Sequence, residues 1–156
     1  MLDWNGRIVA LHSCAAASQP MTAHESLTLI AGKGIAGDRY LLGTGYYSQK
    51  PEEGRQVTLF EIETLLALRR DYDVVLTPAE HRRNVTVEGV PLNHLVGRRF
   101  RLGDTLLEAT RLSIPCRYLE EVTGKNVFKA LMHRSGLNCK IIEGGVIRTG
   151  DRVASC

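Results

Sequence analysis

Short runs of alternating apolar and polar residues, most of them bounded by glycine, make up much of this chain. Alternation with a period of two is typical of strands with one buried face. The pattern predicts strands over residues 6–12, 25–30, 84–88, 98–102, 105–112, 140–143 and 146–153. Gly103-Asp104 joins two of them and is a hairpin signal. About seven short strands with a few helices predict a mainly β (α+β) fold that forms a closed or partly open β-barrel.

Helical patterns are fewer and shorter. Thr58-Leu59-Phe60-Glu61 has the form of a capping box and precedes a periodic apolar run. We expect a helix there, with Ile62, Leu65, Leu66 and Leu68 on its buried face, that ends near residues 69–70. Pro115 suits the first turn of a second helix that reaches residue 121. A third helix is expected over residues 127–134, and a long loop over residues 43–54.

Length and composition place the chain among ordinary globular domains. Its 156 residues, 44% of them hydrophobic and 24% charged, suit one domain over residues 1–156 with a core over about 6–153. Intrinsic disorder is therefore excluded. No apolar run approaches the roughly 18 residues of a membrane span, and the first residues do not have the pattern of a signal peptide. We expect a cytoplasmic protein that binds no membrane.

The charge distribution is more informative than the net charge. A net charge of +3 is too small to indicate nucleic-acid binding. Fifteen of the 20 basic residues, however, are arginine. Guanidinium groups bind phosphate and carboxylate oxygens in bidentate fashion, so this bias is compatible with an oxyanionic ligand. Arginines that only cover the outside and the edges of strands are the alternative, which composition alone favours.

Four cysteines are scattered along the chain, at positions 14, 116, 139 and 156. None forms a C-x-x-C pair, so a structural zinc site is not indicated. Cys116 differs from the others because it stands between Pro115 and Arg117, in the expected first turn of a helix. Free amide groups and a neighbouring cation favour the thiolate, which is the nucleophilic and metal-binding form. The alternative is a buried structural cysteine, which is also our interpretation of the other three.

Two polar stretches are candidates for ligand binding. Asp38 and Arg39 follow a glycine-rich segment that is neither a P-loop nor a dinucleotide fingerprint. Arg82, Arg83 and Asn84 stand at the entry of a strand and suit a phosphate or the amide-like edge of a pterin, although a solvated surface is an equal alternative. The five histidines have no metal-binding spacing, and no G-x-S-x-G motif is present.

Taken in order, these stretches resemble the MOSC family, which is named for the C-terminal domain of molybdenum cofactor sulfurase. The resemblance spans about residues 6–153. It rests on the segments Gly37-Asp38-Arg39-Tyr40, Arg55-Gln56-Val57-Thr58-Leu59, Arg82-Arg83-Asn84 through Leu92 to Gly97-Arg98-Arg99-Phe100, Pro115-Cys116-Arg117-Tyr118-Leu119, and the closing pattern from Gly136 to Asp151.

The resemblance implies a small β-barrel with a pocket for the molybdenum cofactor, molybdopterin with its metal. Cys116 matches the family's hallmark cysteine, which either ligates molybdenum or carries sulfur. Arg82 and Asn84 match its cofactor-contacting stretch. Asp38, Arg39 and Arg55 match recurrent polar positions. The adjoining Arg83 and Arg117 complete the expected cofactor-binding set, which is listed here in full: Asp38, Arg39, Arg55, Arg82, Arg83, Asn84 and Arg117.

Three functions remain open at this point. The first is a molybdenum-dependent reductase of N-hydroxylated small molecules with Cys116 as the metal ligand, supplied with electrons by a separate protein. The second is a non-catalytic carrier that receives sulfur from a cysteine desulfurase as a Cys116 persulfide, or that carries the cofactor itself. The third is a binding protein that has lost the cofactor. No flavin, haem or iron–sulfur motif is present, so we expect a stand-alone domain.

Overall fold

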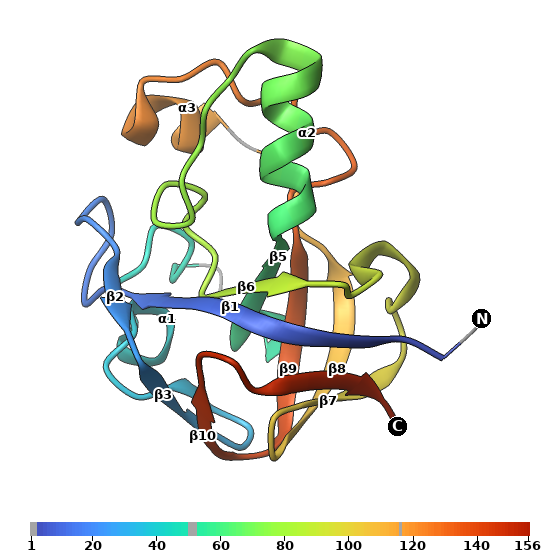
Figure 1. Ribbon diagram of the computed structural model, residues 1–156. Coiled ribbons are helices and arrows are strands. Elements are labelled where there is room, and N and C mark those ends of the chain that lie inside the picture. Colours follow the sequence, from blue (N-terminus) through green and yellow to red (C-terminus); the bar gives the residue numbers. More distant parts are fainter. Residues whose placement is uncertain (1–2, 50–52, 116) are drawn as a thin grey trace.

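The structure is a computed structural model that describes residues 3–49, 53–115 and 117–156 (Figure 1). Strands dominate it. They are β1 (Asn5–Ser13), β2 (Thr22–His24), β3 (Ser26–Ile30), β4 (Gly34–Ile35), β5 (Val57–Glu61), β6 (Val85–Glu88), β7 (Arg99–Leu102), β8 (Thr105–Leu112), β9 (Leu137–Glu143), β10 (Gly145–Arg148) and β11 (Arg152–Ser155). The helices are α1 (Arg39–Leu42), α2 (Ile62–Tyr72) and α3 (Arg117–Thr123), with 3₁₀ turns η1 (Glu53–Arg55) and η2 (Leu92–His94).

The main sheet closes into a barrel through β1. Its strands run in the order β11-β7-β8-β9-β5-β6-β1, and β1 pairs again with β11, with Gly6 opposite Val153. Every pair in this ring is antiparallel except β5 with β6, which run parallel. β2 is added beside β1, and β10, β3 and β4 form a separate small sheet. The predicted mainly β fold with a closed barrel is confirmed.

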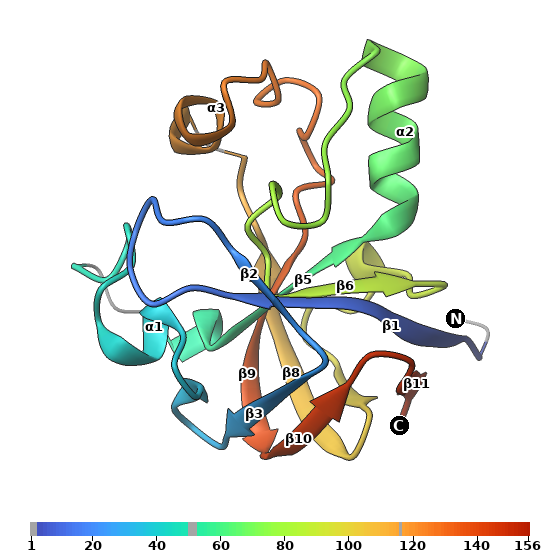
Figure 2. The ribbon, with the colours of Figure 1, turned by 60° about the vertical axis from the view of Figure 1, so that its left-hand side comes forward.

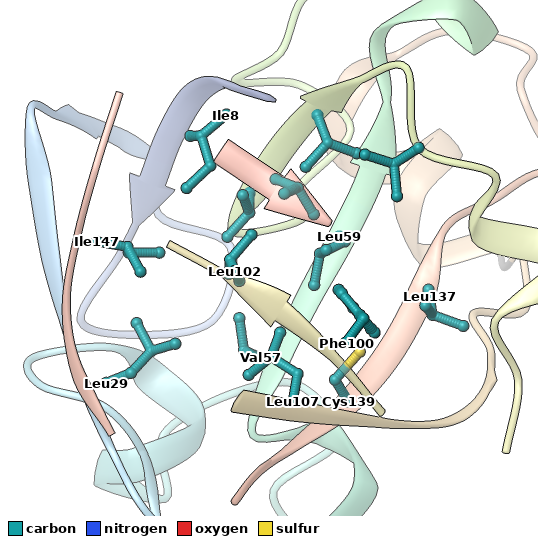
Figure 3. Close-up of a cluster of buried hydrophobic side chains, with 14 of the residues drawn as sticks. Ile8, Leu29, Val57, Leu59, Phe100, Leu102, Leu107, Leu137, Cys139 and Ile147 are labelled. Carbon is teal, nitrogen blue, oxygen red and sulfur yellow. The ribbon is translucent and has the colours of Figure 1, made fainter. Parts of the chain in front are cut away.

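The interior of the barrel is apolar. Side chains from different strands meet there, among them Ile8, Leu59, Phe100 and Leu107, none of which has measurable exposure (Figure 3). In β7 the residues alternate between exposed and buried, as the period of two requires. Alternation along the sequence therefore identified real strands, because one face of each strand lines this core.

A second apolar cluster joins α2 to the connection between β8 and β9, which contains α3. Figures 1 and 2 both show α2 and α3 at the same end of the barrel. The cluster consists of Phe60, Leu65, Leu68, Leu76, Leu119, Val127, Ala130 and Leu131. It anchors residues 119–131 of this connection against the barrel. None of the helices within the described ranges is both long and apolar enough to cross a membrane.

The predicted capping box is wrong. Thr58 lies in β5 rather than at a helix terminus, and α2 begins after Glu61, whose side chain makes no capping hydrogen bond. The Thr58 hydroxyl instead bonds to Asn84 across the sheet. Leu66, expected on the buried face of the helix, is 68% exposed. Tertiary pairing therefore overrides the local capping signal here.

The helix expected over residues 127–134 does not form, and turns occupy that segment. The Glu120 carboxylate accepts a hydrogen bond from the Phe128 backbone N–H at 2.9 Å, and His133 has a left-handed φ of 64°. Val127, Ala130 and Leu131 of this segment are buried all the same, whereas Met132 is exposed. The apolar pattern therefore indicated burial rather than a helix. α3 begins at Arg117, and Pro115 precedes it. The loop expected over 43–54 consists of turns as far as Gln49 and ends in η1.

Glu61 gives a first testable prediction. Burial, together with the nearby Glu63, raises the pKa of its carboxyl to about 7, against an opposing hydrogen bond from the Leu92 backbone. The folded state thus binds this proton more tightly than the unfolded state, and stability is lost as pH rises from about 4.5 to about 7. Because water screens this partly buried group, we expect Glu61→Gln to stabilise the fold by about 1 kcal/mol at pH 8.

The measurement is thermal unfolding of both proteins at pH 5 and pH 8. At pH 5 the gain should largely vanish, since the wild-type carboxyl is then mostly protonated. The exposed Glu25→Gln is the control and should behave like wild type at both pH values. Equal gains for Glu61→Gln at the two pH values would contradict the assignment.

Candidate functional site

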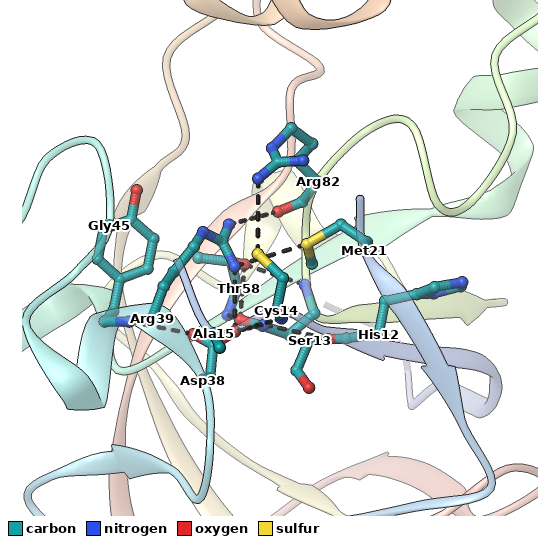
Figure 4. Close-up of polar contacts among 12 residues, drawn as sticks. His12, Ser13, Cys14, Ala15, Met21, Asp38, Arg39, Gly45, Thr58 and Arg82 are labelled. Carbon is teal, nitrogen blue, oxygen red and sulfur yellow. Dashed lines mark hydrogen bonds and ion pairs between the residues drawn. The ribbon is translucent and has the colours of Figure 1, made fainter. Parts of the chain in front are cut away.

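Asp38 is the centre of a buried polar network beside the barrel. It follows Gly37 and caps α1, where its carboxylate accepts a hydrogen bond from the Tyr40 backbone N–H at 3.3 Å. The same carboxylate accepts bonds from the Cys14 backbone N–H at 3.3 Å and from Arg39 Nη1 at 3.0 Å. Asp38 is only 1% exposed (Figure 4). This carboxylate therefore ties the loop after β1 to α1.

Asn84 connects that network to the barrel. Its side-chain oxygen accepts bonds from the Thr58 backbone N–H at 3.2 Å and the Thr58 hydroxyl at 3.0 Å. Its side-chain nitrogen donates to the His12 carbonyl at 3.2 Å and to Asp38 Oδ1 at 3.3 Å. Both ends of the amide are thus engaged by the protein itself. This geometry suits a positioning residue that fixes β1, β5 and the start of β6 relative to one another.

Arg82 lies above this network in a strained conformation. Its φ is 65°, in the left-handed region, and Arg39 Nη2 donates to its backbone carbonyl at 3.0 Å. The Arg82 guanidinium donates to the Gln19 carbonyl at 2.7 Å and to Cys14 Sγ at 3.6 Å. Its Nε is buried without a partner. Arg39 holds the backbone of Arg82, and the Arg82 side chain reaches over Cys14 (Figure 4).

The buried charges in this network do not cancel. Asp38 and Arg39 neutralise each other, whereas Arg82, only 4% exposed, has no carboxylate partner among the residues that the structure describes. A buried charge without a counter-charge costs several kcal/mol, and proteins normally pair it or bind a ligand to it. Arg82 therefore marks a place where an anion is favoured.

His81 fixes the turn that carries both arginines. It is fully buried, stacks on Phe60 with ring centroids 4.2 Å apart, and bonds through Nε2 to the Thr86 hydroxyl at 2.8 Å. Its Nδ1 accepts a hydrogen bond from the Arg83 backbone N–H at 2.9 Å, so the neutral ring carries its proton on Nε2. Burial first, and then the charge of Arg83 and the proximity of His12, hold the pKa of His81 well below its ordinary value.

A cavity of about 210 Å³, here called the arginine pocket, opens next to this turn. Three guanidinium groups line it, together with an amide, a hydroxyl and an aromatic ring. Its lining residues are Tyr47, Arg55, Arg83, Arg111, Ser113, Ile114 and Asn138. They come from the loop after α1, from η1, from the turn before β6, from the end of β8 and the residues that follow it, and from the start of β9. The pocket therefore exists only once the barrel has closed.

Close backbone packing places the arginines. Gly54 lies so close to β8 that a Cβ there would come within 2.4 Å of the Thr110 hydroxyl, which donates a hydrogen bond to the Gly54 carbonyl. This contact sets Arg55 next to Arg111. On the other side, Arg83 donates to the Ser135 carbonyl at 3.0 Å and to its hydroxyl at 3.1 Å. Fixed guanidinium groups around one cavity form a donor set that matches a multiply charged oxyanion.

An aromatic pair links α3 to the loop after α1. Tyr46 and Tyr118 stack with ring centroids 4.0 Å apart and an interplanar angle of 16°. Tyr118 also accepts a hydrogen bond at its hydroxyl from the Ser18 backbone N–H at 2.8 Å. Tyr118 thus joins α3 to two loops, the one after β1 and the one after α1.

The structure brings most of the predicted site residues together. One group consists of Asp38, Arg39, Arg82 and Asn84, which share the buried network. Arg55 and Arg83 line the arginine pocket. Arg117 belongs to neither group: it is exposed, pairs with Glu120 at 3.1 Å and lies over the Phe128 ring. Cys116, the predicted catalytic and metal-binding residue, lies outside the described residues.

Sequence reasoning missed several residues of the site. Arg111, Ser113 and Asn138 belong to the arginine pocket, and Cys14 belongs to the buried network. Arg111 and Asn138 are register partners on β8 and β9 beside a bulge. The available signal was the presence of an arginine and an asparagine inside apolar strands. It did not point to a shared site, because the sequence alone does not show that β8 and β9 are neighbours.

Within the described ranges no cluster of three or more His, Cys, Asp or Glu side chains could hold a metal ion. Cys139 is fully buried, and burial raises the pKa of its thiol, so it acts as an inert core residue. The resemblance-based prediction of a metal ligand thus rests on Cys116. Ser113 and Ile114, which precede it by three and two residues in the sequence, line the arginine pocket.

Comparisons with known proteins place this barrel in a family. Residues 37–154 match the MOSC domain, and the chain belongs to the MOSC family. No curated protein matches the sequence significantly.

Solved structures share the fold. The YuaD protein from Bacillus subtilis superposes with a TM-score of 0.79 at 20% identity, over 98% of this chain and 99% of that one. YiiM from Geobacillus stearothermophilus gives 0.71 at 15% identity, over 97% of this chain and 75% of that one. YiiM from Escherichia coli gives 0.66 at 15% identity, over 99% and 69%. The fold expected from the resemblance is confirmed.

Proposed function

We propose that this MOSC protein binds the molybdenum cofactor and reduces N-hydroxylated small molecules. The observation that carries the proposal is the arginine pocket. Three guanidinium groups, an amide and a hydroxyl meet in one cavity. Two of its lining residues, Ser113 and Ile114, come shortly before Cys116 in the sequence. A phosphorylated pterin needs cations at its phosphate and hydrogen-bonding groups at its ring edge, and the lining residues supply both.

The lining of the arginine pocket suits the phosphate and ring-edge parts of the cofactor. Arg55, Arg83 and Arg111 would hold the phosphate, and Asn138, whose side-chain oxygen accepts a hydrogen bond from the Ser113 hydroxyl, would offer its amide N–H to a polar ring edge. A soft thiolate at Cys116 would ligate the metal. When bound, molybdenum supplies two-electron oxygen-atom transfer, which is the chemistry that removal of an N-hydroxyl oxygen requires.

The buried network has a supporting role in this proposal. Asp38, Arg39 and Asn84 are saturated by one another and by the barrel, so they act as positioning residues that hold the 81–84 turn and its arginines. Arg117 lies apart and would act only through the charge it adds next to Cys116. A separate protein would supply the electrons, since the chain has no redox motif of its own.

The arginine pocket supplies a direct test through Arg111. When the protein is purified from a host that makes the cofactor, we expect Arg111→Gln to reduce its pterin content at least tenfold. The reason is that a charge-assisted hydrogen bond contributes about 1.5–3 kcal/mol. The matched control is Arg117→Gln, which removes an arginine of similar charge outside the pocket and should keep wild-type pterin content.

Equal pterin content in both variants would place the cofactor elsewhere on the molecule. Pterin absent from the wild type as well, with sulfur bound to Cys116 as a persulfide after incubation with a cysteine desulfurase, would instead favour the sulfur carrier. The two functions are therefore separated by the same preparation.

A further inference from the structure

A separate cavity, called here the β1 cavity, lies over the start of β1 and has a volume of about 440 Å³. It adjoins the end of β6, whereas the 81–84 turn and its arginines precede the start of that strand. Figures 1 and 2 show the start of β1 and the C-terminal end of the chain on the side of the barrel away from α3. Among the described residues its lining shares none with the arginine pocket; it includes Asn5, Gly6, Arg7, Glu88, Gly150 and Arg152.

Two arginines stand side by side at the β1 cavity. Arg7 on β1 and Arg152 on β11 are register partners in an antiparallel pair, so both side chains leave the same face of the sheet. Like charges in directly opposite positions destabilise a sheet. Glu88, the register partner of Arg7 on β6, is the only carboxylate among the described lining residues. The β1 cavity therefore has a surplus of positive charge.

The protein uses only part of the hydrogen-bonding capacity of these two guanidinium groups. Arg152 Nε donates to Asn5 Oδ1 at 2.6 Å, and the described part of the chain gives its two terminal nitrogens no acceptor. Arg7 reaches Glu88 through long bonds, 3.3 Å from Nε and 3.5 Å from Nη2, and both side chains are about half exposed. An exposed pair of this kind contributes little stability, so a stronger acceptor can displace Glu88.

Two glycines shape the cavity around the arginines. A Cβ on Gly6 would come within 2.4 Å of the Glu88 carbonyl oxygen, so only glycine lets β1 lie this close to the end of β6. This contact fixes Arg7 beside Glu88. In the turn before β11, a Cβ on Gly150 would meet only open space. The turn therefore leaves room for a ligand next to Arg152.

We infer that the β1 cavity is a second ligand site, which takes a small phosphate monoester held between Arg152 and Arg7. This inference goes beyond the proposed function and does not depend on it. A phosphate monoester presents three terminal oxygens, enough for both guanidinium groups, whereas a carboxylate has two and is satisfied by one. Its double negative charge balances both arginines. The volume lies within the roughly 300–1,000 Å³ of small-molecule sites, which leaves room for the organic part of the ester.

The test is an NMR titration of the isotope-labelled full chain with inorganic phosphate at low ionic strength, and separately with acetate. The backbone amides of Gly6, Gly89 and Gly150, which line the β1 cavity, are followed. Phosphate should shift them in a saturable manner with a Kd below about 10 mM. Acetate should bind at least about fivefold more weakly. Because these amides report on the β1 cavity, phosphate bound in the arginine pocket does not enter the measurement.

Two substitutions at exposed positions have opposite expected effects. Arg152→Gln should weaken phosphate binding at these amides at least about fivefold, because it removes the guanidinium that has no carboxylate partner. Glu88→Gln should tighten binding at least about threefold, because it releases Arg7.

Matched controls make the same changes of charge outside the cavity. Arg98→Gln removes another exposed arginine, and Glu108→Gln releases Arg99, which lies 3.1 Å from it. Both should bind phosphate like wild type. Any of four results would overturn the inference: no saturable shift in the wild type, acetate bound as tightly as phosphate, equal losses in Arg98→Gln and Arg152→Gln, or unchanged binding in Glu88→Gln.

Discussion

Replacing Asp38 by asparagine should lower the free energy of unfolding by about 3–5 kcal/mol. Asparagine keeps the shape of the side chain but removes the charge that balances Arg39, which lies 3.0 Å away and is only 4% exposed. The variant leaves two buried guanidinium groups, Arg39 and Arg82, with no counter-charge in the network. Removing one partner of a buried pair costs far more than the pair itself contributes.

The matched control is Glu143→Gln. Glu143 lies 2.6 Å from Arg101, closer than Asp38 lies to Arg39, but the side chains of Glu143 and Arg101 are both about half exposed. We expect Glu143→Gln to lower the free energy of unfolding by no more than about 1 kcal/mol. Urea unfolding of the wild type and the two variants measures the difference in free energy of unfolding, provided that the three m-values agree. If the two substitutions cost the same, burial would not be what makes the Asp38 network important.

Cys116→Ala should abolish reduction of a hydroxylamine-type base. In the proposed function the Cys116 thiolate is the protein's bond to the metal, and alanine has no donor atom. Changes to groups that merely support a metal ligand already cost about 10–100-fold in metal affinity or activity. Loss of the ligand itself should therefore reduce turnover more than about 100-fold. The assay supplies cofactor-loaded protein with an electron donor and follows loss of the N-hydroxyl substrate.

Cys156→Ala is the control for thiol removal, because Cys156 is exposed and free. It should retain wild-type turnover. The Cys116→Ala protein should also unfold at nearly the wild-type temperature, which separates lost chemistry from lost structure. Wild-type turnover in Cys116→Ala would show that this thiol takes no part in the reaction.

The sequence predicted the barrel well because strand signals are local. Alternation identified β1, β6, β7 and β8 nearly to the residue, and Gly103-Asp104 identified the hairpin between β7 and β8. The helices were harder. Thr58 had a capping pattern, but in the folded protein its hydroxyl donates a hydrogen bond to Asn84 in the sheet. The partner of this hydroxyl is therefore set by strand pairing between residues that are distant along the chain.

The site was predictable only in part, for the same reason. The stretches that contain Asp38 and Arg82 stood out as polar groups after glycines or at a strand start, whereas Arg55 was expected only through the family resemblance. Arg111 and Asn138 did not, since each is an isolated polar residue in an apolar strand until barrel closure pairs β8 with β9. The saturation of Asn84 could not be predicted either, because its partners come from β1, β5 and the loop before α1.

The arginine pocket and the buried network form one arrangement around the 81–84 turn. His81 and Asn84 fix the ends of this turn, Arg39 holds its middle, and Arg83 lines the pocket. A change in the network should therefore disturb the pocket as well. A change at Arg111 should leave the network intact.

The most direct test of the proposed function is the molybdenum and pterin content of wild-type protein and Cys116→Ala, both purified from a host that makes the cofactor. Molybdenum and pterin near one per chain are expected in the wild type. In Cys116→Ala the metal should be lost, with pterin still held by the arginine pocket. Wild-type protein with neither molybdenum nor pterin would show that this chain does not bind the cofactor.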